Sequence, residues 1–283
     1  FRLMSSVVSS REVTFAAAGA VAGCAVAYSL LHRLGRQSVR RVVWGTLDKS
    51  WRPDGRKQRP PWGEEKPLTL EPSALKSKYN FFISAYVPRP IALVSSISKD
   101  GVVNLSPFSY SGIVNHDPGT IVFSCVDKGK DGGDTLKNVK ATSQFVVHVM
   151  SEWFLEAANH TCGNFAPEVD EFLESALTPV PSTRVAPPRV QEAALAMECL
   201  VEHVIPLARP DDGKVTATMV VGRVVLVHVA PHVFDQEKHV VVPEKLRPMA
   251  RLGGNTYSQI GDVFDLPRPK IPPAVPPPSS SSS

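Results

Sequence analysis

The chain has few cysteines, and it lacks the motifs that mark the common nucleotide and hydrolase sites. Its four cysteines, at positions 24, 125, 162 and 199, show no CxxC pair and no regular spacing. A disulfide scaffold needs more cysteines in a shorter chain, so we expect buried, reduced thiols. The Gly-rich string at 129–134 matches neither the Walker pattern nor GxGxxG, and no GxSxG is present. These absences weaken the NTPase, dinucleotide-fold and hydrolase interpretations.

Histidine and cysteine spacing does not predict a metal site. His160 stands near Cys162, and His228 stands near His232. His228 lies in a strand-like run, where residues four apart share a face but are separated by about 13 Å, too far for one small ion. We therefore expect no metal centre.

Charge of one sign is also not in large excess. The 283 residues carry 31 basic and 27 acidic side chains, a net charge of +4, part of which falls in one N-terminal segment. This balance does not favour a nucleic-acid partner. With 43% hydrophobic and 20% charged residues, the chain can bury a sizeable core, which excludes wholesale disorder and a many-pass membrane protein.

The N-terminal part contains the one long uncharged run. After a leader at 1–12, residues 13–31 form nineteen residues without a charge, about 28 Å as a helix and close to the thickness of a bilayer core. Gly19 and Gly23 form a GxxxG pair, and arginines follow the run. A membrane anchor with the following domain on the cytosolic or matrix side, an organellar transit peptide and a cleaved secretory signal all remain open.

Three further regions follow this segment. Residues 32–66 are predicted to be a basic, proline-bearing linker, and residues 267–283 end in PPPSSSSS, which predicts a disordered tail. The region at 67–266 holds the remaining apolar runs, so we expect it to form the folded domain.

Short runs rich in β-branched residues predict strands in this domain. They lie at 91–98, 120–126, 144–150, 197–207 and 215–229. Helical spacing is found at 134–143, 151–160 and 167–177, with Asp134 and Ser151 as expected N-caps. Asp170, Glu171 and Glu174 are expected to form a solvated charged face. Because strands and helices do not alternate, we expect a mainly antiparallel β-barrel with helices packed outside.

The hairpin at 86–110 is the most unusual stretch. An apolar strand changes into hydroxyl residues at Ser95 and Ser96, and the returning strand carries Asn104 and Ser106 before Pro107. A proline within a strand predicts a bulge or a sheet edge. Neutral donors near such an opening suit a planar polar ligand with an anionic tail, whereas an ordinary hairpin with a Ser-rich solvent face is the alternative.

Four strings in this order resemble the flavin reductase-like domain family, the FMN-binding split barrels associated with flavoprotein oxygenases. The strings are PRPIALVSSIS with GVVNLSPFSY, DPGTIVFS (117–124), the Lys130 to Thr135 stretch leading to QFVVHV, and LRPMARLGGNTY (246–257). Together they span about residues 80 to 258. The resemblance implies a split β-barrel, a homodimer and a flavin near the dimer interface.

The resemblance also implies the residues that contact the cofactor. Ser95, Ser96, Asn104, Ser106, Pro107, Phe108 and Ser109 are candidates for the flavin or its phosphate; Lys130, Asp134 and Thr135 are candidates near the phosphate; and Arg251 and Tyr257 are candidates that close the site. The string KGKDGGDT is longer than the family's Lys-Asp-Thr arrangement, which leaves Lys128 as an alternative to Lys130. His148 stands where family members often have Asn.

The implied activity is that of an FMN-dependent oxidoreductase, with FAD as an alternative cofactor. NAD(P)H would donate electrons through the flavin to free flavin, oxygen or another acceptor, and no catalytic side chain is expected because the chemistry belongs to the cofactor. Two alternatives stay open: a membrane-tethered FMN-binding electron carrier without nicotinamide activity, and a ligand-free barrel that acts as a dimeric scaffold.

Overall fold

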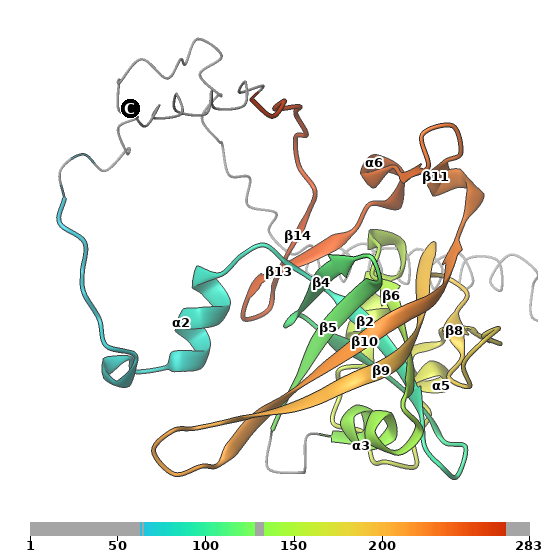
Figure 1. Cartoon of the computed structure of the whole chain (residues 1–283), viewed down its shortest axis with the longest axis horizontal. Coiled ribbons are helices and arrows are strands. Elements are labelled where there is room, and N and C mark those ends of the chain that lie inside the picture. Colours follow the sequence, from blue (N-terminus) through green and yellow to red (C-terminus); the bar gives the residue numbers. More distant parts are fainter. Residues whose placement is uncertain (1–62, 64, 128–132, 270–283) are drawn as a thin grey trace, which may run out of the picture. The chain divides into compact units, whose positions relative to one another are not determined.

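The computed structural model describes residue 63, residues 65–127 and residues 133–269 (Figure 1). By compactness the chain divides into Phe1–Pro67 and Leu68–Ser283. Everything described below belongs to the second unit. The expected membrane or targeting segment, the leader, almost all of the linker and most of the tail lie outside the described residues. Within the described part, no helix is long and apolar enough to cross a bilayer.

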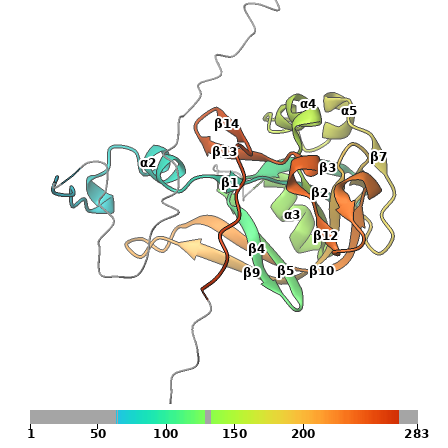
Figure 2. The same cartoon turned by 90° about the horizontal axis from the view of Figure 1, so that it is seen from above.

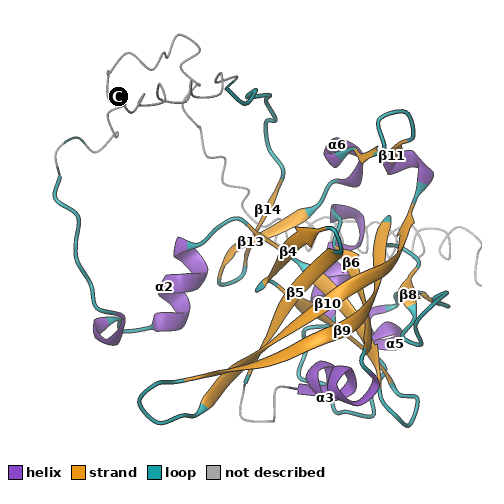
Figure 3. Cartoon of the chain, in the orientation of Figure 1, coloured by secondary structure: helices purple, strands orange, loops and turns teal. Residues whose placement is uncertain are grey.

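An antiparallel sheet of seven strands is the main element of the described residues (Figure 3). Its spatial order is β3-β2-β6-β9-β10-β5-β4. The strands are β2 (Ala92–Ile97), β3 (Val103–Phe108), β4 (Ser111–His116), β5 (Gly119–Val126), β6 (Gln144–Val149), β9 (Leu195–Ala208) and β10 (Val215–Val229). The five predicted strand regions are therefore confirmed. Their β-branched composition favours strands because such side chains pack well on a pleated sheet.

The sheet curls around an apolar interior, as the barrel prediction requires. Val94 of β2, Phe123 of β5 and Phe145 of β6 are fully buried in one cluster. Phe108 of β3 also contacts Phe123, with ring centroids 5.0 Å apart, so side chains from distant strands meet inside. Helix α3 (Gly133–Thr142) adds Leu136 and Val139 to the same cluster. The edge strands β3 and β4 do not pair with each other, which leaves the barrel split.

Smaller elements surround the barrel (Figure 2). Three short strands, β1 (Arg89–Pro90), β13 (Met249–Gly253) and β14 (Thr256–Gln259), form a second sheet in the order β1-β13-β14. Two-stranded sheets are made by β7 (Pro179–Val180) with β8 (Arg189–Val190), and by β11 (Phe234–Asp235) with β12 (Val240–Val241). The other helices are η1 (Pro72–Ala74), α2 (Lys78–Ala85), η2 (Glu152–Phe154), α4 (Leu155–His160), α5 (Glu171–Ser175), η3 (Pro231–Val233) and α6 (Pro243–Leu246).

Helix boundaries differ from the predictions in three places. Helix α3 begins at Gly133, so Asp134 lies in its first turn and is not the residue before it. Ser151 precedes η2 and α4, but its side chain makes no capping hydrogen bond. The helix expected at 167–177 is limited to α5, where Asp170 caps the start by accepting from the Phe172 N–H. The expected start at Pro167 is therefore too early. The helix begins after Asp170, because the Asp170 side chain satisfies a free N–H of the first turn.

The prediction of a solvated face at Asp170, Glu171 and Glu174 is wrong for Glu171. Its side chain is buried, and Oε2 accepts from the backbone N–H of Leu105 at 3.0 Å. Leu105 lies on edge strand β3, where this N–H has no strand to pair with. Burial raises the pKa of the Glu171 carboxyl above its ordinary value, although the Leu105 N–H opposes that shift. The carboxylate therefore covers the open edge that unpaired strands present.

Pro107 lies on this same edge strand, as predicted. Its pairing with Leu93 belongs to an unbroken β2–β3 register, so no bulge is present. In an antiparallel ladder the N–H groups alternate between the two sides of a strand, and the outward N–H of Leu105 places the nitrogen of Pro107 outward as well. The proline consequently costs the sheet no hydrogen bond.

Two of the cysteines are buried, as expected, and a third is exposed. Cys125 and Cys199 are buried free thiols, and burial raises both of their pKa values to about 12. Cys162 is exposed, so the expectation of burial is wrong there, and Cys24 lies outside the described residues. Among the described residues, no group of three or more His, Cys, Asp or Glu side chains could hold a metal ion.

His148 is a fully buried structural residue. Its Nδ1 lies 2.9 Å from the carbonyl oxygen of Leu93, and its Nε2 lies 3.0 Å from the N–H of Val190. Because a carbonyl only accepts and an N–H only donates, Nδ1 carries the proton and Nε2 accepts. A second proton would face the Val190 N–H. Burial lowers the pKa of His148 to about 4, with the Leu93 carbonyl acting in the opposite direction.

We expect acid to destabilise the fold through His148. Between pH 6.5 and pH 4, His148 binds a proton in the unfolded chain but stays neutral in the native state. The free energy of unfolding therefore falls as pH falls, by about 3 kcal/mol across this range. Urea unfolding at pH 7.0 and pH 4.5 measures the loss, with His148→Asn as the matched variant. An equal loss in His148→Asn and the unmodified protein would show that His148 does not set this dependence.

Candidate functional site

A buried polar cluster connects the hairpin to the N-terminal turn of α3. Asn104 Nδ2 donates to Thr135 Oγ1 at 2.8 Å and to Ser96 Oγ at 3.2 Å. Asn138 Nδ2 also donates to Ser96 Oγ, at 3.2 Å. All four side chains are buried. The predicted residues Ser96, Asn104 and Thr135 are thus brought together, although 31 positions separate Asn104 from Thr135.

Asn138 belongs to this cluster but was not among the predicted site residues. It lies three positions after Thr135, on the same face of α3. Helical spacing could have identified it, because residues i and i+3 are neighbours on a helix surface. The cluster fixes α3 so that its first turn, with four N–H groups lacking helical partners, lies next to β3.

Ser106 of β3 and Ser109, which follows the end of this strand, are both predicted residues and are half-buried. Among the described residues, neither hydroxyl makes a hydrogen bond to a protein group, so both remain available to a ligand. Pro107 and Phe108 lie between them, and the Phe108 ring points inward to Phe123. The predicted contacts from Asn104 to Phe108 therefore lie along one edge strand, with Asn104, Ser106 and Phe108 on one face and Pro107 on the other, and Ser109 follows the end of the strand.

Ser95 is separated from this group. Side chains alternate along β2, so Ser95 lies on the opposite face from Ser96. Its hydroxyl is buried and donates to the Pro188 carbonyl at 2.5 Å. Ser95 therefore holds the 181–190 loop against the outer surface of the sheet. Its hydroxyl is already bonded, so its contact with a flavin stays a prediction that this geometry does not support.

The structure describes Asp134 but not Lys130. Asp134 lies in the first turn of α3, 3.8 Å from Lys137 Nζ at the closest oxygen. Lys130 and the alternative Lys128 fall in 128–132, outside the described residues. Lys137 is a cation on the same turn that the sequence interpretation did not include.

Arg251 and Tyr257 form a pair on the β13–β14 hairpin. They lie directly opposite each other in the register, and the Arg251 guanidinium carbon is 4.4 Å from the centre of the Tyr257 ring. The Tyr257 hydroxyl donates to Asn159 Oδ1 at 2.5 Å. Burial raises the pKa of Tyr257, although Arg251 opposes the shift. Tyr257 also packs on the outer apolar cluster that contains Leu105 of β3.

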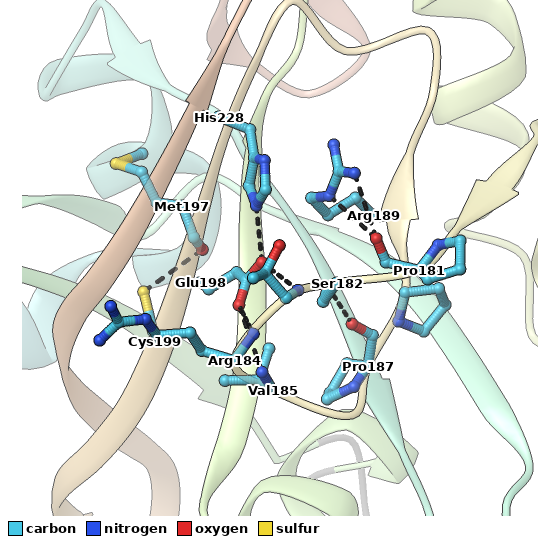
Figure 4. Close-up of polar contacts among 12 residues, drawn as sticks. Pro181, Ser182, Arg184, Val185, Pro187, Arg189, Met197, Glu198, Cys199 and His228 are labelled. Atoms are coloured by element: carbon cyan, nitrogen blue, oxygen red, sulfur yellow. Dashed lines mark hydrogen bonds and ion pairs between the residues drawn. The ribbon is translucent and has the colours of Figure 1, made fainter.

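A second buried polar network anchors the 181–190 loop. Glu198 of β9 is fully buried and accepts hydrogen bonds from three successive backbone N–H groups, those of Thr183, Arg184 and Val185, at 2.7, 2.6 and 3.2 Å (Figure 4). His228 Nε2 of β10 supplies a fourth contact at 2.6 Å. Burial raises the pKa of the Glu198 carboxyl, but these donors outweigh it and hold the value below its ordinary range. This network shapes the fold and leaves no carboxylate oxygen free for a metal.

The groups along β3 and α3 fit a flavin nucleotide. Free hydroxyls at Ser106 and Ser109 can bond ring nitrogens and carbonyls. Both N–H groups of the Asn104 amide are already donated to Ser96 and Thr135, so only its carbonyl oxygen can serve a ligand, as an acceptor. The N–H groups at the start of α3, which is ten residues long, together with Lys137, favour an anion such as a phosphate. The hydroxyl donors along the strand are neutral, and the N–H groups of the helix start lie at one end, beside the Lys137–Asp134 pair, as a planar polar ring with an anionic tail requires.

Comparisons with known proteins agree with this geometry. Residues 84–248 match the model of the "Flavin reductase like domain" family. The chain is 39% identical over 208 residues to the uncharacterized protein BH2278 of Halalkalibacterium halodurans, which covers 72% of this chain and 98% of that protein.

Two solved structures are similar over nearly their whole length. One is nitrilotriacetate monooxygenase component B from Bacillus cereus, with 35% identity, a TM-score of 0.68, and coverage of 71% of this chain and 100% of that one. The other is the Pseudomonas fluorescens 2-nitrobenzoate 2-nitroreductase NbaA, with 30% identity, a TM-score of 0.63, and coverage of 73% and 99%. The chain belongs to the flavin reductase-like domain family and has its split-barrel fold.

Proposed function

We propose that the protein is an FMN-binding oxidoreductase that takes electrons from NAD(P)H and passes them to free flavin or another acceptor. The observation that supports this most is the pair of uncommitted hydroxyls at Ser106 and Ser109, in the same segment as Asn104, which bonds the first turn of α3. Family membership and the names of the two similar structures, a monooxygenase component and a nitroreductase, point to redox chemistry. FAD is the alternative cofactor.

In this proposal the chain binds and orients, while the flavin supplies two-electron transfer when bound. The first turn of α3 and Lys137 hold the phosphate, with Thr135 oriented by Asn104. Ser106 and Ser109 bond the polar edge of the ring. Phe108 supplies apolar surface on the inner face of β3, and Pro107 supplies it on the opposite face.

We also propose a homodimer. Edge strand β4 exposes Ile113 and Val114, with 73% and 59% of their surface accessible, and the α2 segment exposes Phe81, Phe82 and Tyr86. Apolar surface of this extent is unusual on a monomer and is typical of an interface. A second copy covering β4 would lie close to the split between β3 and β4.

The alternative is an FMN-binding electron carrier without nicotinamide activity. The absence of a nicotinamide motif in the sequence is compatible with both functions. Anchoring by residues 13–31, or import into an organelle, stays a proposal that fractionation of cells expressing the full chain would test.

We expect the purified full chain to contain FMN and to oxidise NADH or NADPH. The visible spectrum and chromatography of the released flavin measure the cofactor, sedimentation velocity measures the dimer, and absorbance at 340 nm measures turnover. Ser106→Ala should weaken FMN binding about tenfold, because one hydrogen bond to a polar ligand is lost, with Ser258→Ala on the outer hairpin as the control. A flavin-loaded protein without turnover would favour the carrier, and a protein that binds no flavin would exclude both functions.

A further inference from the structure

Two arginines and a tyrosine lie in one row across the small sheet. Arg89 of β1 pairs with Arg251 of β13, and Arg251 pairs with Tyr257 of β14. Directly opposite residues of antiparallel strands share a face, with Cβ atoms about 5 Å apart. Two like charges in this arrangement are unfavourable unless an anion lies between or beside them.

No protein anion is present for either charge in the described part of the chain. None of the ion pairs among the described residues involves Arg89 or Arg251. Backbone carbonyls and aromatic rings surround the two guanidinium groups. Arg251 Nη2 donates to the carbonyl of Gly254 at 2.5 Å, the Tyr257 ring lies 4.4 Å from Arg251, and the Tyr110 ring lies 6.0 Å from Arg89.

One edge of the Arg89 guanidinium is uncommitted. Arg89 is only 5% exposed, and Nη1 donates to the carbonyls of Ile83 and Tyr86 at the C-terminal end of α2. Nε is buried without a hydrogen-bond partner. Nη2 also makes no hydrogen bond to a described residue. The Nε–Nη2 edge is the fork that binds carboxylate or phosphate oxygens in a bidentate manner.

This edge lies at the end of the candidate flavin site that is opposite to α3. Arg89 comes seven positions before Ser96, about 24 Å in extended chain, and it faces Tyr110, the residue that follows Ser109 at the end of the β3 row. With the phosphate of a flavin at α3, the other end of the row, next to Tyr110, would hold the ring.

We propose that Arg89 and Arg251 form a second oxyanion site, which holds an anionic group of the molecule that exchanges electrons with the flavin ring. This inference rests on the proposed function for the position of the ring, but not for the existence of the anion site. The ligand is a planar organic molecule with a carboxylate or a phosphate. An organic acceptor would supply a carboxylate, and a nicotinamide dinucleotide would supply a phosphate.

The capping of α2 by Arg89 does not account for these features. Two carbonyl contacts to Nη1 explain why one nitrogen of Arg89 is held, but they leave its Nε–Nη2 edge unbonded. The Arg251 guanidinium bonds one carbonyl, that of Gly254, and has no acidic partner among the described residues. An acidic side chain of a second copy is the competing occupant, and it would make the arginines dimer contacts.

The test uses the full chain, with and without added FMN, and isothermal titration with benzoate, NADH and NADPH. Arg251→Gln removes a half-exposed guanidinium, and Arg89→Lys keeps a charge that can reach the α2 carbonyls but lacks the fork. Arg223→Gln, whose partner is the exposed Glu202, is the matched control. We expect at least one probe to bind the unmodified protein and the control, and to bind about tenfold or more weakly to Arg251→Gln and Arg89→Lys.

The probes separate the two sources of the oxyanion. Binding of benzoate assigns a carboxylate, and binding of either dinucleotide without benzoate assigns a phosphate. If Arg251→Gln lost affinity for FMN but not for riboflavin, the cofactor's own phosphate would lie here and the inference would be overturned. Weaker dimerisation with unchanged titrations would also overturn it, and so would the failure of every probe to bind. Benzoate binding to a chain that takes up no flavin would support the anion site while refuting the proposed function.

Discussion

Replacement of Glu198 by alanine is expected to lower the free energy of unfolding by about 4 kcal/mol. The carboxylate is fully buried and accepts from three backbone N–H groups and from His228. Alanine leaves those N–H groups without an acceptor, and each buried unsatisfied donor costs about 1–3 kcal/mol. Chemical denaturation at pH 7, followed by circular dichroism, measures the change.

Two variants sharpen this experiment. Glu198→Gln retains one acceptor oxygen but turns an NH₂ group toward the other donors, so we expect a loss nearly as large. Glu156→Ala removes an exposed carboxylate of α4 and should change stability by less than about 0.5 kcal/mol. A loss below about 1 kcal/mol in Glu198→Ala would mean that the 181–190 loop is not held by this carboxylate.

The same contact has a pH dependence of definite sign. Because the pKa of Glu198 is below its ordinary value in the native state, its stabilising contribution is present above the unfolded-state pKa. That contribution is lost as pH falls through the native value. Acid unfolding should therefore depend less on pH in Glu198→Ala than in the unmodified chain.

Replacement of Asn104 by alanine is expected to reduce FMN affinity by about a hundredfold. The amide is a predicted ligand contact, and it also positions Thr135 at the start of α3. Its loss therefore removes the acceptor oxygen that the amide would offer to the flavin and the two bonds that fix the orientation of the phosphate-binding turn. Equilibrium dialysis against FMN, with the spectrum of the bound fraction, measures the affinity.

The control for this variant is Asn164→Ala, which changes an exposed amide in the loop before α5. Riboflavin gives a second comparison, because a defect confined to the α3 turn should weaken FMN more than riboflavin. Unchanged FMN affinity in a folded Asn104→Ala protein would remove β3 and α3 from the binding site.

Local pattern was sufficient for much of the fold. The five β-branched runs became strands at nearly the expected residues, and the proline at position 107 correctly indicated an edge strand. These features depend on neighbours in the sequence, since side-chain period and backbone sterics act within a few residues. The predicted helix at 167–177 was too long because its capping residue, Asp170, lies in the middle of that span.

The grouping of side chains was less predictable. Ser95 and Ser96 both carry hydroxyls, yet alternation sends Ser95 to the outer face and Ser96 to the cluster at α3. Glu171 seemed to be solvated because two other acids lie near it, but α5 packs on β3 and carries this carboxylate to Leu105, 66 positions away. No local signal distinguishes an acid on a solvated helix from one that covers a strand edge.

The sequence by itself determined the barrel strands, the hairpin with its polar residues, and the family to which the chain belongs. Tertiary structure alone decided which of those polar residues meet, that Glu198 accepts from N–H groups of a loop 13 to 15 positions before it, and that Arg89 and Arg251 share a face without an acid. The physical reason is range: propensity and periodicity act over a few residues, whereas burial and strand register bring together groups that are tens to more than a hundred positions apart.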